Sequence, residues 1–214
     1  MIVLKFFKTG TSALAAHVDT LRAVTYTLRR AKINAEYSQG YNPHMELGFS
    51  SPLPLGVNSV AEYVSIKAQA DSELLDRLQN LCPLGMKFVK MWTMPTDVNL
   101  AAKITRADYE IVCQGIGSVI EEVTADGYQI TYVEKGAEVT KDVSARIFAA
   151  RRDGADKAKV TLAVGNENLR PDRLVRYLMQ KYDLNGDYDV TKIDSYTADG
   201  IAVDEWLDSI ENGK

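Results

Sequence analysis

Residues 2–32 read IVLKFFKTGTSALAAHVDTLRAVTYTLRRAK. Residues 2–7 are mostly apolar, which is typical of a strand. Residues 9–12 (TGTS) predict a turn that also caps a helix, because a hydroxyl oxygen can accept from the free amides of a first helical turn. Apolar side chains then recur at helical spacing over residues 13–32, which predicts a long helix. These side chains belong to Leu14, Val18, Leu21, Val24, Leu28 and Ala31.

The segments that follow continue this alternation of strands and helices. In the first half of the chain we expect strands at 35–38, 45–50, 61–69 and 86–94, and a helix at 71–81. In the second half we expect strands at 108–114, 127–134, 138–149, 158–164 and 187–197, and helices at 117–125 and 171–182. Each half then approximates the order β-α-β-β-α-β, which is the split βαβ or ferredoxin-like order.

This order predicts an α+β fold of two tandem ferredoxin-like domains with antiparallel sheets. The first domain would span residues 1–95 and the second residues 106–199, joined where Pro95 and a polar run interrupt the pattern. Residues 200–214 would form an acidic C-terminal tail with a short helix at 203–210. The halves share no clear residue-level repeat, so the duplication is inferred from the element order.

Composition is that of a folded, soluble protein. The 214 residues are 46% hydrophobic and 25% charged, and no stretch approaches the ~20 apolar residues that a membrane helix needs. The first ten residues are too short and too charged for a signal peptide. Cys82 and Cys113 lie far apart, which argues for a reducing compartment and against a disulfide framework. We therefore expect a cytoplasmic protein without a membrane partner.

Charge is unevenly distributed along the chain. Residues 1–95 contain ten Lys or Arg and seven Asp or Glu, a net charge of +3. Residues 96–214 contain fifteen and twenty-two, a net charge of -7. The first half is therefore better suited to an anionic partner than the second.

Residues 37–56 (YSQGYNPHMELGFSSPLPLG) combine rigid turns with an array of polar groups. Gly40 permits a turn that a side chain would block, and Pro43 stiffens the next one. The array suits recognition of a polar planar ligand such as a nucleobase, although a self-satisfied structural loop is an equally good interpretation. Its candidate binding residues are Ser38, Gln39, Tyr41, Asn42 and His44, with Glu62 on the next strand placed to reach back to an arginine.

The helix at 13–32 carries a second, polar stripe that includes Arg22, Arg29 and Arg30. One interpretation is a solvated face with an Asp19–Arg22 pair, worth a few tenths of a kcal/mol. The other is an arginine platform for phosphate or carboxylate groups, which guanidinium binds bidentately. His17 falls on the apolar side of the same helix, so it is either a core-edge histidine or a group facing the 37–44 loop.

Several kinds of site are excluded by what the sequence lacks. It has no Walker A loop, no dinucleotide fingerprint, no nucleophile elbow and no His/Cys cluster with zinc spacing. It also lacks the three closely spaced cysteines that hold an iron–sulfur cluster. We therefore expect no metal and no cofactor. If any residue is catalytic, the candidates are His17 and His44.

Several of these residues together resemble the radical SAM-linked protein family. The resemblance is densest over residues 5–65, and Ala16 departs from it, because the family usually has Ser before the histidine. The matching residues are Phe7, Lys8, Gly10, His17, Asp19, Arg22, residues 29–31, Tyr37, Ser38, residues 40–44, Pro52, Leu53, Pro54, Gly56, Glu62 and residues 169–172. The family is a bacterial domain of unknown function found beside, or fused to, radical SAM proteins. The resemblance implies a radical SAM partner and no reaction of this chain's own.

Three hypotheses about function follow. The first is an accessory protein that presents a substrate, RNA or a ribosome-associated component, to a radical SAM enzyme. The second is a metal-independent endoribonuclease, because the expected fold is similar to that of the CRISPR repeat-processing enzymes; His17 or His44 would act with Arg22 or Arg29. The chain lacks the glycine-rich loop of those enzymes. The third is a purely structural interaction module.

Overall fold

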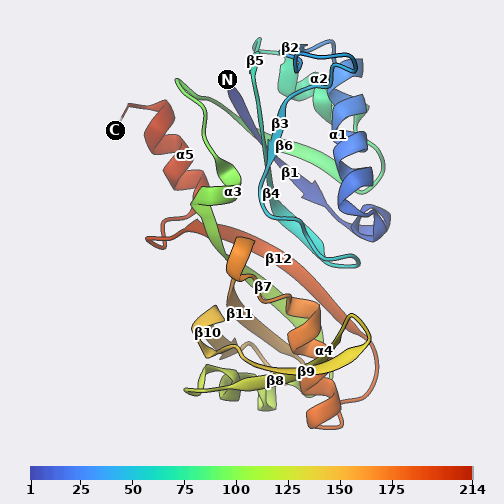
Figure 1. Ribbon diagram of the computed structural model, residues 1–214, viewed down its shortest axis with the longest axis vertical. Helices are drawn as coiled ribbons and strands as arrows, with labels where there is room; N and C mark the ends of the chain where they lie inside the picture. Colours follow the sequence, from blue (N-terminus) through green and yellow to red (C-terminus); the bar gives the residue numbers. More distant parts are fainter. Residues whose placement is uncertain (214) are drawn as a thin grey trace.

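One mixed β-sheet runs through the molecule, with helices packed on its faces (Figure 1). The computed structural model describes residues 1–213. The strands are β1 (Ile2–Lys8), β2 (Asn34–Ala35), β3 (Leu47–Phe49), β4 (Asn58–Ile66), β5 (Ala68–Gln69), β6 (Met86–Thr93), β7 (Ile104–Cys113), β8 (Gln129–Glu134), β9 (Ala137–Asp142), β10 (Ile147–Arg152), β11 (Lys157–Ala163) and β12 (Tyr188–Thr197). The α-helices are α1 (His17–Arg30), α2 (Leu74–Leu81), α3 (Leu100–Lys103), α4 (Pro171–Lys181) and α5 (Val203–Glu211).

The eight-stranded sheet has the order β10-β11-β7-β12-β4-β1-β6, and β3 pairs with the far end of β4. Its ladders are antiparallel except where β12 meets β4. That parallel ladder pairs Thr191 with Asn58 and Lys192 with Ser59. The predicted α+β class is confirmed, whereas two tandem ferredoxin-like domains with purely antiparallel sheets are not, because one sheet spans both halves.

In the first half, alternate residues of β1 face opposite sides of the sheet, as the strand period of two requires. Ile2, Leu4 and Phe6 pack under α1 and α2 with Val24 and Leu28. Between them Val3 points to the other face, which α3 and α5 cover (Figure 1). The first half is therefore buried on both faces of its sheet.

α5 supplies part of that second face. Val203 and Leu207 are fully buried against Tyr63 and Trp92. Asp204 accepts hydrogen bonds from Lys5 and from the Tyr63 hydroxyl, and Asp208 accepts from Lys90 and the Trp92 indole. The Lys90 ammonium and the Trp92 indole N–H hold the pKa of the Asp208 carboxyl below its ordinary value. The short helix expected at 203–210 within the acidic C-terminal tail is confirmed as α5, and Asp204 and Asp208 bind partners in the first half. Residue 214 lies outside the described residues.

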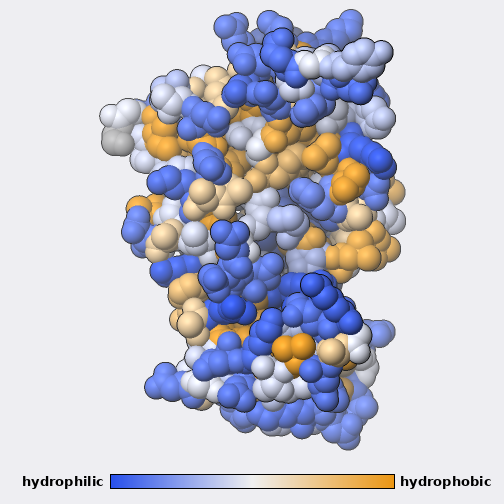
Figure 2. All heavy atoms as spheres, viewed as in Figure 1, coloured by the Kyte–Doolittle hydropathy of each residue, from blue (hydrophilic) through white to orange (hydrophobic). Residues whose placement is uncertain are grey.

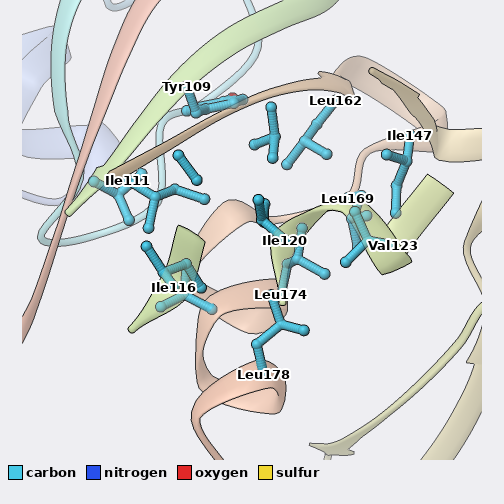
Figure 3. Packing of buried hydrophobic residues seen from close by; sticks show 14 of the residues in the cluster. Tyr109, Ile111, Ile116, Ile120, Val123, Ile147, Leu162, Leu169, Leu174 and Leu178 are labelled. Atoms are coloured by element: carbon cyan, nitrogen blue, oxygen red, sulfur yellow. The ribbon is translucent and has the colours of Figure 1, made fainter. Parts of the chain in front are cut away.

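The core of the second half lies between its strands and α4 (Figure 3). Leu174 and Leu178 of α4 face Ile111 and Leu162 of the strands. The remaining side of this core is closed by two 3-10 helices, Ile116–Ser118 and Ile120–Thr124.

The α-helix predicted at 117–125 is therefore wrong, because these residues form 3-10 helices instead. Gly117 lies so close to the 154–155 backbone that a Cβ there would be 2.1 Å from the Gly154 carbonyl oxygen. The segment is also rich in β-branched residues, which disfavour an α-helix. The strands predicted at 127–134 and 138–149 are found in part as β8 and β9, which form a hairpin whose turn residues Lys135 and Gly136 both have positive φ. Beyond it, residues 147–152 form the separate strand β10, paired with β11.

Two further boundaries differ from those predicted. Residues 10–14 form a 3-10 helix and α1 begins only at His17, because the Ser12 hydroxyl donates to the Leu84 carbonyl instead of capping a helix. As a result Leu14, Val18 and Leu21 are exposed, whereas Val24, Leu28 and Ala31 are buried as expected. Residues 100–103, inside the predicted linker, form α3, and β7 already begins at Ile104.

None of the helices in residues 1–213 has the length and apolar character needed to cross a bilayer.

Candidate functional site

A pocket of about 580 Å³ lies between α1 and β3, and we call it the α1–β3 pocket. One wall is the outer face of α1, with Leu21, Arg22, Thr25, Tyr26 and Arg29. The opposite wall is formed by residues 44–48 with Ser65 and Lys67. Figure 2 shows hydrophobic residues gathered over the strands beside α1, on this side of the molecule. The pocket therefore combines an apolar floor with a cationic wall.

The two arginines of α1 that line the pocket, Arg22 and Arg29, keep their guanidinium groups at the surface. Arg22 lies 3.3 Å from the Asp19 carboxylate in an exposed i,i+3 pair, which contributes little to stability. The Arg29 guanidinium lies over the Tyr37 ring, 5.9 Å from its centroid. These groups do not bond to one another or to Glu62, as a closed internal scaffold would require. They are placed to meet an anion entering the pocket.

His44 reaches the pocket from a tightly closed loop. Its Nδ1 lies 2.8 Å from the Ser38 hydroxyl, and its backbone N–H donates to the same oxygen at 3.1 Å. The Ser38 N–H donates in turn to the His44 carbonyl at 2.9 Å, and Gly40 has a φ of +137° that favours glycine. Ser38 therefore positions His44 and does not itself line the pocket.

A salt bridge between Lys67 and Glu46 lies in the wall of the pocket that faces α1. The Lys67 ammonium lies 2.8 Å from a Glu46 carboxylate oxygen. The Lys67 partner lowers the pKa of Glu46, and Glu46 raises the pKa of Lys67. Both groups therefore stay charged near neutral pH, and each neutralises the other. Asp97 also lines the pocket and offsets part of the charge of Arg22 and Arg29, so the lining keeps a small net positive charge.

The other predicted site residues lie outside this pocket. Gln39, Tyr41 and Asn42 are exposed on the outer side of the loop, and Arg30 is exposed at the end of α1. Tyr41 is fully exposed. The structure thus brings together Arg22, Arg29 and His44, and leaves these four at the surrounding surface.

Glu62 and His17 belong to a different part of the molecule. The Glu62 carboxylate is buried, accepting from the Ser59 hydroxyl at 2.7 Å and from Lys192 at 2.9 Å. The expectation that it reaches an arginine is wrong, because the Lys192 ammonium of β12 occupies that place. The His17 ring packs edge-on against Phe49, with centroids 5.5 Å apart, and lines a second cavity.

Sequence reasoning missed the residues that the strands contribute to the pocket. Leu47 and Lys67 come together only through the register in which Leu47 pairs with Ile66. A single sequence carries no signal for such a register. The exposed Leu21 could have been suspected, because the apolar stripe of residues 13–32 is broader than one packed face needs.

Comparison with known proteins places most of the chain in one family. The model of the family described as "Uncharacterized protein conserved in bacteria (DUF2344)" matches residues 1–171. No curated protein matches the chain. Among solved structures, a chain of "Crystal Structure of a Cbf5-Nop10-Gar1 Complex" is similar with a TM-score of 0.47 and 13% identity, over all of this chain and 56% of that one. This chain thus spans little more than half of that protein. With four-fifths of its residues matched by the family model, the chain belongs to the DUF2344 family of bacterial proteins.

Proposed function

We propose that the protein is an accessory binding protein that holds single-stranded RNA at the α1–β3 pocket and presents it to a radical SAM enzyme. The observation that carries the proposal is the pairing of two exposed arginines with aromatic and apolar surface in one concave site. Single-stranded nucleic acid is bound by this combination, with cations on the phosphates and bases stacked on aromatic rings. Tyr26 and Tyr37 are exposed beside the two arginines and are the candidate stacking residues.

The RNA part is tested by replacing Arg22 and Arg29 together with Ala. We expect weaker binding of a single-stranded oligonucleotide, and a slope of log affinity against log salt that is shallower by about 1.4, since each lost phosphate contact removes about 0.7. The measurement is fluorescence anisotropy over a range of salt concentrations. Because both side chains are exposed, unfolding stability should change by less than about 0.5 kcal/mol.

The matched control is Arg30→Ala with Arg151→Ala, which removes the same charge from exposed positions outside the pocket. Its salt slope should stay close to that of the unaltered protein. An unchanged slope in the Arg22/Arg29 variant, or an equal change in the control, would show that RNA does not bind at the α1–β3 pocket.

The radical SAM partner is supported by the family resemblance and by exposed apolar side chains next to the pocket. Val18 of α1 and Leu14 of the 3-10 helix before it are exposed, as is Leu21 at the pocket wall. We expect a radical SAM protein, identified by mass spectrometry, to co-purify with the chain from bacterial cells, and Val18→Asp to reduce its recovery severalfold. Leu84→Asp, at another exposed leucine, is the control. If Val18→Asp does not change the recovery, this face of α1 is not the surface that binds the radical SAM protein.

The finer description of the fold, two tandem ferredoxin-like domains divided near residues 95–106, also stays a proposal. Its support is the β-α-β-β-α-β order of the principal elements in the first half, β1, α1, β3, β4, α2 and β6.

A further inference from the structure

A second cavity, of about 420 Å³, lies where the two halves meet, and we call it the central cavity. The start of α1, the turn at residues 51–55 and the start of α4 surround it, together with Tyr109 of β7 and Lys192 of β12. Its charged or titratable cationic residues are His17, Arg170 and Lys192, and its lining within residues 1–213 contains no Asp or Glu. This size suits a small molecule, and the lining offers cationic hydrogen-bond donors, although Lys192 and Arg170 are each paired with a carboxylate behind the lining.

The start of α1 has free backbone donors, and of its residues Ala16 and His17 line this cavity. The cap residue Ala16 has an extended backbone and no side chain able to accept a hydrogen bond. In the described part of the chain the N–H groups of His17, Val18 and Asp19 have no hydrogen-bond acceptor, and the first amide satisfied within the helix is that of Thr20. Such amides, together with the helix dipole, favour a bound oxyanion.

Lys192 adds a buried positive charge. Its side chain is 3% exposed, and its ammonium lies 2.9 Å from the Glu62 carboxylate. An ammonium has three N–H donors, and within residues 1–213 Glu62 is the partner that the Lys192 side chain bonds. Arg170 is less available, because its guanidinium holds the Asp172 carboxylate through two hydrogen bonds of 3.0 and 2.8 Å.

Tyr109 provides a further hydrogen-bond donor at the cavity, independent of α1 and Lys192. It is 3% exposed, it lines the cavity at the edge of the second-half core (Figure 3), and its hydroxyl has no hydrogen-bond partner in the described residues. Burial, and secondarily Glu62 and Asp172, raise the pKa of this hydroxyl, so it stays protonated and can donate. The hydroxyl is therefore free to donate to a ligand that occupies the cavity.

From these groups we infer that the central cavity binds a small organophosphate. Its phosphate would accept hydrogen bonds from the first amides of α1, the Lys192 ammonium and the Tyr109 hydroxyl. Its apolar body would lie against the 51–55 turn and Leu169, which supply the hydrophobic part of the lining. This site is separate from the α1–β3 pocket and does not depend on RNA binding there.

Phenyl phosphate is the probe, and calorimetric titration of the full chain is the measurement. We expect saturable binding of phenyl phosphate, with much weaker binding of benzoate and none of the neutral benzyl alcohol. Tyr109→Phe keeps the ring and should weaken binding about tenfold, because it removes a hydrogen bond to a charged group. Tyr128→Phe is the matched control: Tyr128 is also a buried tyrosine, and it lies outside the cavity.

Two more variants locate the site. Lys192→Met combined with Glu62→Gln removes both charges of the buried pair without leaving one alone, and it should also weaken binding at least about tenfold if the ammonium holds the phosphate. Arg22→Ala with Arg29→Ala should leave the phenyl phosphate affinity unchanged. Equal binding of benzoate, an equal loss in Tyr128→Phe, or loss in the Arg22/Arg29 variant would each overturn the assignment.

Discussion

Replacing Lys192 with Met should destabilise the protein by about 3–5 kcal/mol, because it leaves the buried Glu62 carboxylate without its cation. Lys8 replaces the lost partner only in part: burial lowers its pKa and the nearby Glu62 carboxylate raises it, but its ammonium donates to the Ala15 carbonyl and not to Glu62. Chemical denaturation monitored by circular dichroism measures the effect. Both partners are nearly inaccessible to water, so solvent screening should not reduce it as it does for a surface pair.

The double variant Lys192→Met, Glu62→Gln separates burial of a lone charge from loss of packing. It should recover most of the lost stability, since neutral groups of similar volume can replace a buried ion pair with little net cost. If the single and double variants are equally unstable, the loss comes from side-chain packing at the joint between β4 and β12, and the ion pair contributes little.

Leu207→Ala should destabilise the protein by about 2–5 kcal/mol, as expected when a fully buried leucine is truncated. The cavity would open beside Trp92 and Tyr63. We therefore expect a lower unfolding temperature and a change in tryptophan fluorescence in the folded state.

Leu84→Ala is the matched control, because Leu84 is largely exposed and its truncation should cost less than about 0.5 kcal/mol. A small effect at Leu207, similar to that at Leu84, would mean that α5 contributes little to the stability of the first half.

The parts of the fold that follow from local periodicity could be predicted. Val24, Leu28 and Ala31 recur at helical spacing and are buried, and Lys135-Gly136 turns a hairpin because both residues accept a positive φ. The α-helix predicted at 117–125 is wrong, and there the backbone of the distant Gly154 lies directly against Gly117. Periodicity cannot report such long-range contacts.

The candidate site was predictable to the same limited extent. Arg22, Arg29 and His44 were selected from their residue types, and the fold places them around one pocket. The partner of Glu62 could not be predicted, because Lys192 lies 130 residues away in the sequence. The central cavity could not be foreseen at all, since the start of α1 meets α4 and β12 there only through the joining of the two halves.

That joining has a consequence for how the protein is made. The strand β12 pairs with β7 on one side and β4 on the other, and α5 follows it directly onto the first half. During synthesis, residues 1–95 leave the ribosome long before residues 188–211 exist. Until then Glu62 has no Lys192, and the face of the sheet around Tyr63 and Trp92 is uncovered. The first half therefore stays incomplete until the last strand and helix have been made, and it closes only after synthesis has passed residue 211.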